Sequence, residues 1–197
     1  MKILAFTDLH ASKKALAEIK KKSKDADLIV CCGDFTVFGK SAKEVLKELG
    51  TIQKDIILVH GNHEEGLDIP RGITKYKNIK YIHKKTLKVG NFEFIGYGGG
   101  GFSLVDKEFE KFAQEHEKKK NLILVTHGPP YGTALDKLNF GHCGCKSYTR
   151  FIKKAKPLMM LCGHIHENER KSEQLGKTII INPGPHGALI AIEQEQQ

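Results

Sequence analysis

The sequence has 197 residues, of which 40% are hydrophobic and 28% are charged, and its formal net charge at pH 7 is +9. This length and composition are typical of one compact globular domain and exclude a disordered chain. No apolar run approaches the roughly 20 residues that span a bilayer, so no membrane association is expected. We therefore predict a single domain over residues 1–197.

The first part of the chain alternates short apolar runs with segments of helical periodicity. Strands are expected at residues 3–6, 27–32 and 56–59, with helices at 12–22 and 41–49 between them. Ser41, followed three residues later by Glu44, predicts a capping box at the start of the second helix. Strands that alternate with helices predict parallel pairing with right-handed crossovers.

The pattern changes after the third apolar run, because closely spaced strand-like pieces follow one another. In chain order we expect strands at 79–83, 86–90 and 91–98, a helix at 106–117, a strand at 121–126, a helix at 146–155, and strands at 157–162, 178–182 and 188–192. The sum predicts a mixed α/β fold of two packed sheets with helices outside. The apolar strand at 188–192 can be an edge that pairs between chains, so both a monomer and a homodimer stay open.

Cysteine usage and charge narrow the setting of the protein. Five cysteines without a signal peptide favour reduced thiols in a cytoplasmic protein. Cys31, Cys32 and Cys162 lie in apolar runs and are expected in the core. The positive charge suits a polyanionic partner, but lysine runs at helix ends are explained as well by solvated surface. Nucleic acid is therefore a possible partner and not the favoured one.

Residues of metal-ligand type follow five of the buried runs. In chain order they are Asp8 and His10, then Asp34, then Asn62 and His63, then His127, and last His164 and His166. In open α/β sheets ligands bind outside the carboxyl ends of the strands, so these residues are expected to converge in space.

The donor types point to metal ions. Oxygen and nitrogen donors without thiolates suit manganese, iron or zinc, and they are too many for one tetrahedral ion, so we expect two ions. The pairs Asp8/His10 and His164/His166 each have one residue between them, which in an extended segment sends both side chains to the same side. Each pair can then grip one shared site, and Gly163 gives the backbone room to turn.

Five short blocks, in this order, resemble the signature of the calcineurin-like metallophosphoesterase superfamily: DLH (8–10), GD (33–34), GNHE (61–64), THG (126–128) and GHIH (163–166). The stretches HGPP (127–130) and GHCGC (141–145) are further similar to small phosphoesterases grouped near the bacterial cyclic-nucleotide phosphodiesterases. The resemblance implies a four-layer αββα sandwich of two mixed β-sheets flanked by helices.

The resemblance also implies a role for each matching residue. Asp8, His10 and His166 would hold the first metal and Asp34 would bridge, while Asn62, His127 and His164 would complete the second. His63 would contact the phosphate and protonate the leaving oxygen, and Glu64 would orient His63 from behind. Mn, Fe, Ni and Zn all accept these donors.

Such a site implies phosphoester hydrolysis, in which a metal-bridging hydroxide attacks phosphorus while His63 donates a proton. A phosphodiesterase is favoured, because every ligand and the acid are present. A phosphomonoesterase or a nuclease on the same site is the alternative. The expected substrate is a phosphoester, with nucleotides among the candidates. A non-catalytic interaction module is disfavoured because His63 is present.

The remaining histidines and a glycine run have less definite interpretations. His83 and His116 are expected at the surface, and His60 is expected to be structural. His142 and His186 lie in loops that can face the cleft, and we name His142 with Asn62 and His63 as a substrate contact. The Gly98–Gly101 run can let a loop approach a substrate closely.

Overall fold

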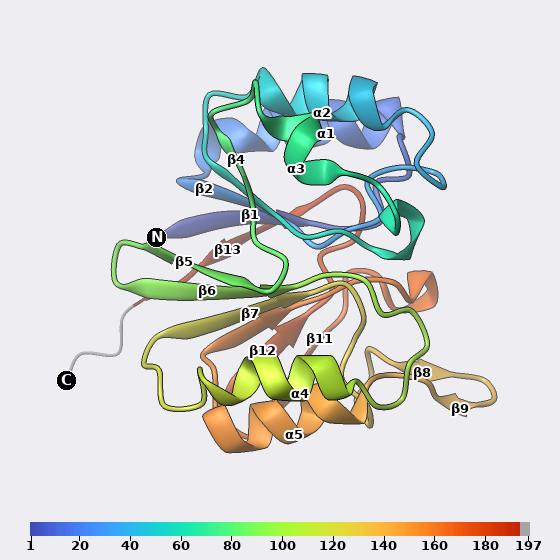
Figure 1. Ribbon diagram of the computed structural model, residues 1–197, viewed down its shortest axis with the longest axis vertical. Helices are drawn as coiled ribbons and strands as arrows, with labels where there is room; N and C mark the ends of the chain where they lie inside the picture. The colour runs from blue at the N-terminus through green and yellow to red at the C-terminus, as the bar shows by residue number, and fades with distance from the viewer. Residues whose placement is uncertain (194–197) are drawn as a thin grey trace.

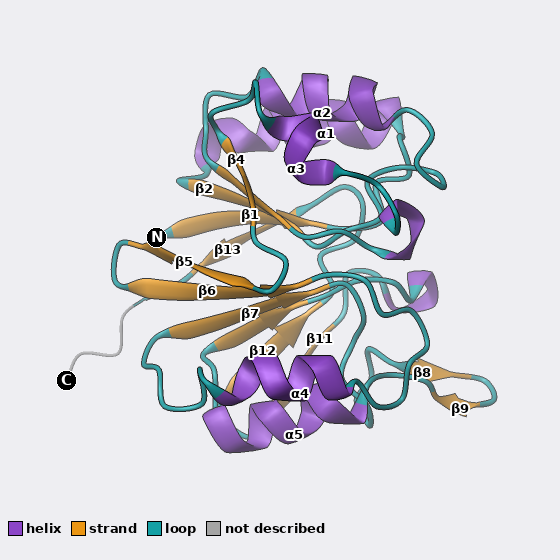
Figure 2. Cartoon of the chain, in the orientation of Figure 1, coloured by secondary structure: helices purple, strands orange, loops and turns teal. Residues whose placement is uncertain are grey.

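The computed structural model describes residues 1–193. Two β-sheets stack face to face, with helices on the outer face of each, as Figure 1 and Figure 2 show. This arrangement confirms the predicted α/β class and the four-layer αββα sandwich of two mixed sheets. Within residues 1–193, no helix is both long and apolar enough to cross a membrane.

The first sheet is built by the N-terminal part of the chain and one C-terminal strand. Its strands, in spatial order, are β13 (Ala188–Ala191), β1 (Lys2–Phe6), β2 (Leu28–Cys31), β3 (Ile56–Leu58) and β4 (Ile79–Tyr81). All neighbours pair in parallel except β13, which is an antiparallel edge strand. The outer face is covered by α1 (Lys13–Lys22), α2 (Ala42–Gly50) and α3 (Ile69–Ile73), and α1 continues into a short 3-10 turn at Ser23–Asp25.

The second sheet has parallel strands in its centre and antiparallel strands at both edges. In spatial order they are β11 (Ser172–Leu175), β12 (Thr178–Ile181), β10 (Met159–Leu161), β7 (Leu122–Thr126), β6 (Phe92–Tyr97) and β5 (Lys85–Val89). Helices α4 (Lys107–Gln114) and α5 (Lys146–Ala155) cover its outer face (Figure 1). A small hairpin of β8 (Lys137–Leu138) and β9 (Gly141–His142) projects beyond this half.

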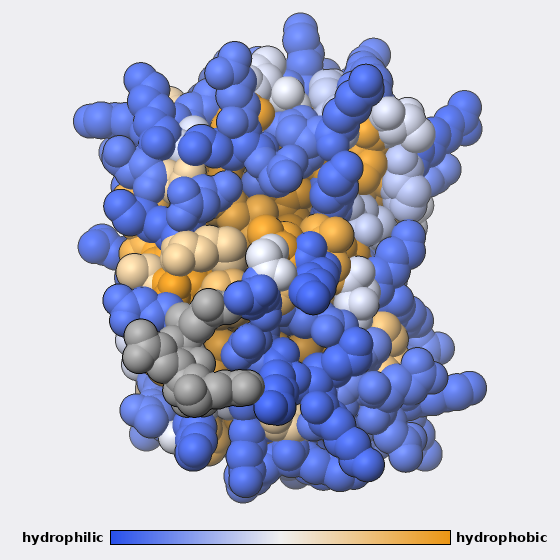
Figure 3. All heavy atoms as spheres, turned by 90° about the vertical axis from the view of Figure 1, so that its left-hand side faces the viewer, coloured by the Kyte–Doolittle hydropathy of each residue, from blue (hydrophilic) through white to orange (hydrophobic). Residues whose placement is uncertain are grey.

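The apolar runs are continuous because the central strands are buried on both faces. Along β1, Leu4 and Phe6 face the helices, whereas Ile3 and Ala5 face the second sheet. The layer between the sheets is a core of its own, and Figure 3 shows apolar side chains in a band across the middle of one face. Members at the margin of this core are only partly buried: Met1, Leu87, Val89, Leu158, Ile181 and Ile190.

The starts of α1 and α2 differ in how they are capped. At α1 the Ser12 hydroxyl accepts a hydrogen bond from Ala15 N at 3.3 Å. At α2 the Ser41 side chain makes no capping bond, and its backbone is left-handed with φ of 61°. A capping serine normally has extended backbone. The capping box predicted for Ser41 and Glu44 is therefore wrong.

Candidate metal centre

Residues that follow strands of both sheets meet at one end of the sandwich. The Asp8 amide, after β1, donates to Gly33 O at 3.0 Å, and the Gly163 amide, after β10, donates to His127 O at 2.7 Å. The two halves are joined where the Asp8 carboxylate accepts a hydrogen bond from His164 N at 3.0 Å. The structure thus brings the expected strand ends together, although the contributing strands belong to two different sheets.

Three groups of side chains at this place have ligand atoms within 4.8 Å of one another: Asp8, His10 and His166; His10, Asp34 and His63; and Asp34, His127 and His164. Asp34 belongs to two of the groups and His10 also to two. Asp34 therefore lies close both to His10, a member of the first group, and to His127 and His164, as a bridging ligand requires.

In the first group, two imidazole nitrogens face each other. The Nε2 atoms of His10 and His166 are 3.1 Å apart, and Asp8 Oδ1 lies 3.6 Å from His166 Nε2. His10 Nδ1 is 3.0 Å from Thr36 O. Because a carbonyl only accepts, His10 Nδ1 carries the proton. His10 Nε2 then carries a lone pair, which accepts from His166 Nε2 and is the pair that a metal ion would take.

The third group repeats this arrangement in the interior. His127 is fully buried, and its Nδ1 donates to Cys32 O at 3.0 Å. Its Nε2 lies 3.0 Å from Asn62 Oδ1 and 3.3 Å from Asp34 Oδ2. His164 Nε2 is buried without a hydrogen-bond partner, and burial lowers the pKa of His164 to about 4. An unpaired neutral imidazole beside a carboxylate suits a divalent cation, so these residues fit one.

Asp34 is ionised in this setting. It is 2% exposed, and although burial opposes ionisation, the hydrogen bond and charge of His127 lower its pKa to about 2. Its Oδ1 accepts a hydrogen bond from His63 N at 2.9 Å. A buried carboxylate that keeps its charge can serve two cations with its two oxygens.

Left-handed backbone is concentrated at these residues. The φ angles are 51° at Asp8, 45° at His10, 49° at Asp34 and 73° at His164. Such values are uncommon outside glycine and cluster at functional sites. The expectation that Asp8 and His10 share a site through extended geometry therefore has the wrong reason, because a left-handed turn joins them.

The structure also corrects the prediction that His164 and His166 share one metal site. The two side chains fall in different groups, His166 with Asp8 and His164 with Asp34. The prediction that this pair grips one shared site is wrong. The separation agrees with the split between two metals that the family resemblance implies.

Two glycines make room for carboxylates. A Cβ atom on Gly163 would lie 2.5 Å from Asp8 Oδ2 and would overlap Thr7 Oγ1. A Cβ atom on Gly61 would overlap Asp34 Oδ1. The space left by the missing side chain of Gly163 is therefore occupied by Thr7 and Asp8.

His63 lies in a short 3-10 turn, Asn62–Glu64, with its ring beside the groups. Its Nδ1 accepts a hydrogen bond from Phe38 N at 3.3 Å, and its Nε2 is 3.9 Å from Asp34 Oδ2. Because Nδ1 accepts, the proton of the neutral ring is on Nε2, on the side of Asp34.

Glu64 has a different partner from the one expected. Its buried carboxylate accepts from Asp34 N at 2.9 Å, Gly61 N at 3.0 Å, Thr36 N at 2.8 Å and Thr36 Oγ1 at 2.6 Å. Burial raises the pKa of Glu64, although these hydrogen bonds oppose the rise. The expectation that Glu64 stands behind the His63 ring is corrected: Glu64 holds the backbone that presents Asp34, and Phe38 N bonds to His63.

Two exposed phenylalanines border the groups, and sequence reasoning singled out neither. Phe38 stacks on His63 with ring centroids 4.0 Å apart, and Phe102 meets His164 edge-on at 4.6 Å. A single aromatic residue in a loop carries no periodic signal, so only tertiary contacts could find them.

The other histidines lie outside the three groups. His142 is exposed on β9 and pairs with Asp136 Oδ1 at 2.8 Å, and His186 pairs with Glu18 at 3.1 Å. His83 and His116 are both partly buried, so the surface position expected for them is wrong, and His83 accepts a hydrogen bond from Gly98 N at 2.9 Å. His60 packs against His83, and its Nδ1 is 2.7 Å from the Tyr81 hydroxyl, which suits the structural role expected for it.

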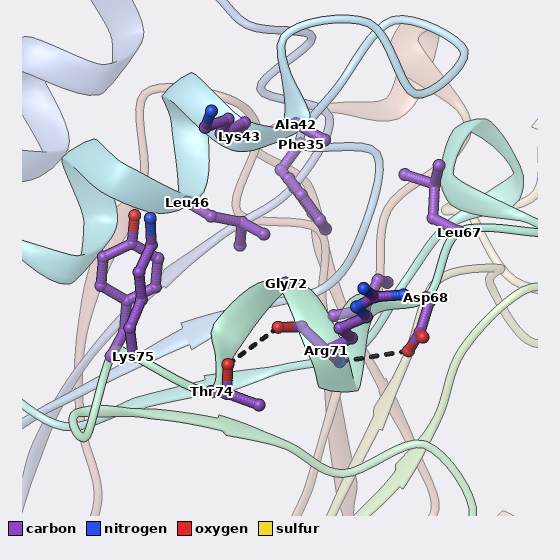
Figure 4. Close-up of a pocket in the computed structure, with 12 residues that line it drawn as sticks. Phe35, Ala42, Lys43, Leu46, Leu67, Asp68, Arg71, Gly72, Thr74 and Lys75 are labelled. Carbon is purple, nitrogen blue, oxygen red and sulfur yellow. Dashed lines mark hydrogen bonds between the residues drawn. The ribbon is translucent and has the colours of Figure 1, made fainter.

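A separate cavity of about 420 Å³ lies between α2 and α3, where Figure 4 shows Leu46, Leu67 and Phe35 among its lining. Asp68 is the one carboxylate in that lining, and it accepts from Arg71 N at 3.1 Å. No histidine lines this cavity, so it does not compete with the centre as a metal site.

The two sheets bring aspartate–histidine groups together at their strand ends, and comparison with known proteins assigns the chain to a class of phosphoesterases. Residues 1–168 match the family model of calcineurin-like phosphoesterases, and the chain belongs to this family. An uncharacterized protein of Methanocaldococcus jannaschii is 34% identical over 96% of this chain and 91% of its own length.

Two solved structures show the same fold. The protein TT1561 of Thermus thermophilus superimposes with a TM-score of 0.77 at 18% identity, over 96% of this chain and 93% of that chain. A novel archaeal phosphodiesterase superimposes with a TM-score of 0.57 at 18% identity, over 93% of this chain and 84% of that chain. At these identities the likeness establishes the fold, and the family assignment rests on the match above.

Proposed function

We propose that this protein is a dinuclear-metal-dependent phosphodiesterase that uses His63 as a general acid. The observation that carries the proposal is that the three ligand groups share members: His10 joins the first group to the second, and Asp34 joins the second to the third. His63 Nε2 lies 3.9 Å from Asp34 Oδ2, next to these groups. Asp8, His10 and His166 would hold one divalent ion, Asn62, His127 and His164 would hold the other, and Asp34 would be the ligand shared between them. The donors suit Mn, Fe, Ni or Zn, with manganese as our first choice for reconstitution.

When bound, the two ions neutralise phosphoryl oxygens and supply a nucleophile by lowering the pKa of water. The chain itself contributes position and a proton. Asn62 and His63 contact the phosphate. His63 acts in its doubly protonated, imidazolium form, so that transfer of the Nε2 proton to the leaving oxygen leaves a neutral ring. Glu64 acts through Asp34, because its hydrogen bonds hold the loop that presents that carboxylate.

His142 is the proposed third contact to the substrate. It lies on β9, in the hairpin beyond the second sheet, and the buried Asp136 carboxylate orients its ring. Asp136 also accepts hydrogen bonds from Thr133 N and Gly144 N, so the loop that carries the hairpin is held at several points.

The preference for diesters is supported by the fold shared with an archaeal phosphodiesterase. A monoesterase or a nuclease on the same site is the alternative. A cavity of about 700 Å³ supports the nuclease, because Lys14, Lys22, Arg170 and Lys171 are among its lining residues.

The deciding test is hydrolysis of bis(p-nitrophenyl) phosphate beside p-nitrophenyl phosphate, on metal-stripped protein to which Mn²⁺ is added back. We expect metal-dependent turnover that favours the diester. His63→Ala should lower the rate by about 10²–10⁴-fold because the general acid is lost. Its metal content should stay at the wild-type level, whereas Asp34→Ala should lose metal because the bridging carboxylate is removed.

His116→Ala is the matched control, since this histidine lies outside the three groups. Equal metal content in His63→Ala and Asp34→Ala would contradict the division of roles. Preference for the monoester would favour the alternative, and no turnover of either ester with any of the four metals would refute the proposal.

A further inference from the structure

Two exposed phenylalanine rings flank the candidate metal centre from opposite halves of the sandwich. Phe38 lies in the loop after β2 of the first sheet and is 73% exposed. Phe102 lies in the loop after β6 of the second sheet and is 62% exposed. Their burial in the core would be favourable, so the stability of the fold does not explain their position.

Unusual backbone conformations hold both rings in place. Phe38 has φ of 48°, a left-handed value that is rare for a bulky residue and costs energy. Phe102 follows three glycines, Gly99, Gly100 and Gly101, with φ of 78°, 105° and 40°. Only glycine adopts such angles freely, which gives the glycine run of the sequence a definite use: it turns the chain so that Phe102 reaches His164.

The ring geometry leaves flat faces open next to the site of chemistry. Phe38 stacks on His63 with 17° between the planes, so one face is covered and the other is free. Phe102 meets His164 at 61°, an edge contact that covers neither face fully. The ring nitrogens of His63 and His164 each lie within 4.8 Å of an Asp34 carboxylate oxygen. The two phenylalanines therefore border the place where the phosphate is expected.

We propose that Phe38 and Phe102 form an aromatic platform that binds a planar ring, a nucleobase or another aryl group, on the phosphoester substrate. The inference rests on the proposed function and adds the class of ester group that the site selects. Two separate phenyl faces match a flat π system, which stacks on one side chain at a time. The contact of Phe38 with His63 also places this ring beside the proton donor.

The test is calorimetric titration of the Mn²⁺-loaded protein with phosphonates, which are not hydrolysed. Phenylphosphonate and methylphosphonate share the charged head and differ only in the ring. We expect phenylphosphonate to bind at least about fivefold more tightly, the lower end of what one stacked ring contributes. The double variant Phe38→Ala/Phe102→Ala keeps the backbone N–H that bonds to His63 and should bring this ratio close to one.

Phe140→Ala is the matched control, because this ring is 81% exposed in the turn between β8 and β9. It should keep the wild-type ratio. The phosphonate analogue of adenosine monophosphate separates the two sources of the ring: tighter binding than phenylphosphonate supports a nucleotide, and equal or weaker binding supports a simpler aryl ester.

The inference is overturned if the wild type binds both simple phosphonates equally, or if the double variant keeps the preference. Both results leave the proposed function standing, provided that Mn²⁺-dependent hydrolysis of bis(p-nitrophenyl) phosphate is seen. Failure of both phosphonates to bind, together with no hydrolysis, would instead overturn the proposed function and the inference with it.

Discussion

At the scale of single residues, the absence of a side chain at Gly163 lets the two halves of the molecule meet. Thr7 and Asp8 from the first sheet occupy the space in which a Cβ on Gly163 would stand. The next amide along the chain, His164 N, then donates to the Asp8 carboxylate. A methyl group at this position would push Asp8 away from His10 and His166.

We expect Gly163→Ala to lose metal and to lower diester hydrolysis by about 10²-fold, the effect of displacing a catalytic group by roughly 1 Å. Metal content by elemental analysis and kcat/KM are the measurements. Gly72→Ala is the control, because its Cβ would meet only Leu46 Cδ1, at 3.3 Å. Wild-type metal content in Gly163→Ala would show that Asp8 tolerates the methyl group.

At the scale of secondary structure elements, a serine precedes both α1 and α2, but only Ser12 of α1 caps its helix with a side-chain hydrogen bond. Replacing Ser12 by alanine should lower the free energy of unfolding by about 1 kcal/mol, because Ala15 N loses its acceptor. Ser41→Ala should change it by less than about 0.5 kcal/mol, since the Ser41 hydroxyl caps nothing in α2. Urea denaturation measures both, and equal losses would contradict the assignment of the caps.

The elements that could be predicted are the ones with a strong periodic signal. The helix expected at 146–155 has these same bounds in the structure, and the buried strands were all located within a few residues. The prediction missed α3, β11 and the β8–β9 hairpin. They are short, and along β11 exposed residues alternate with half-buried ones, so no apolar run marks them. β11 forms a strand because its backbone pairs with β12, and this pairing has no counterpart in the local sequence pattern.

At the scale of the whole molecule, the candidate centre is a link between the two sheets. Asp8 and His10 follow β1, whereas His127 and His164 follow β7 and β10. Ions bound there would crosslink the halves and stabilise the folded state by mass action, by about 2.7 kcal/mol at a metal concentration 100 times Kd.

We therefore expect chelation to lower the melting temperature by about 5–10 °C and Mn²⁺ to restore it. His166→Ala should show a smaller shift, because the first group loses a ligand, and His116→Ala should behave like the wild type. Differential scanning calorimetry with and without chelator measures the effect. An unchanged melting temperature in the wild type would argue against a metal that binds across the sheets.

The family, the layered fold and the strand ends that converge could all be predicted from local patterns, because apolar periodicity and the five motif blocks are properties of adjacent residues. Several site contacts could not. That His164 and His166 serve different groups, that Glu64 supports Asp34, and that Phe38 and Phe102 border the histidines depend on contacts between residues far apart in the chain. Such contacts arise only when two sheets pack, and side-chain direction at a left-handed turn has no signal in the order of residues.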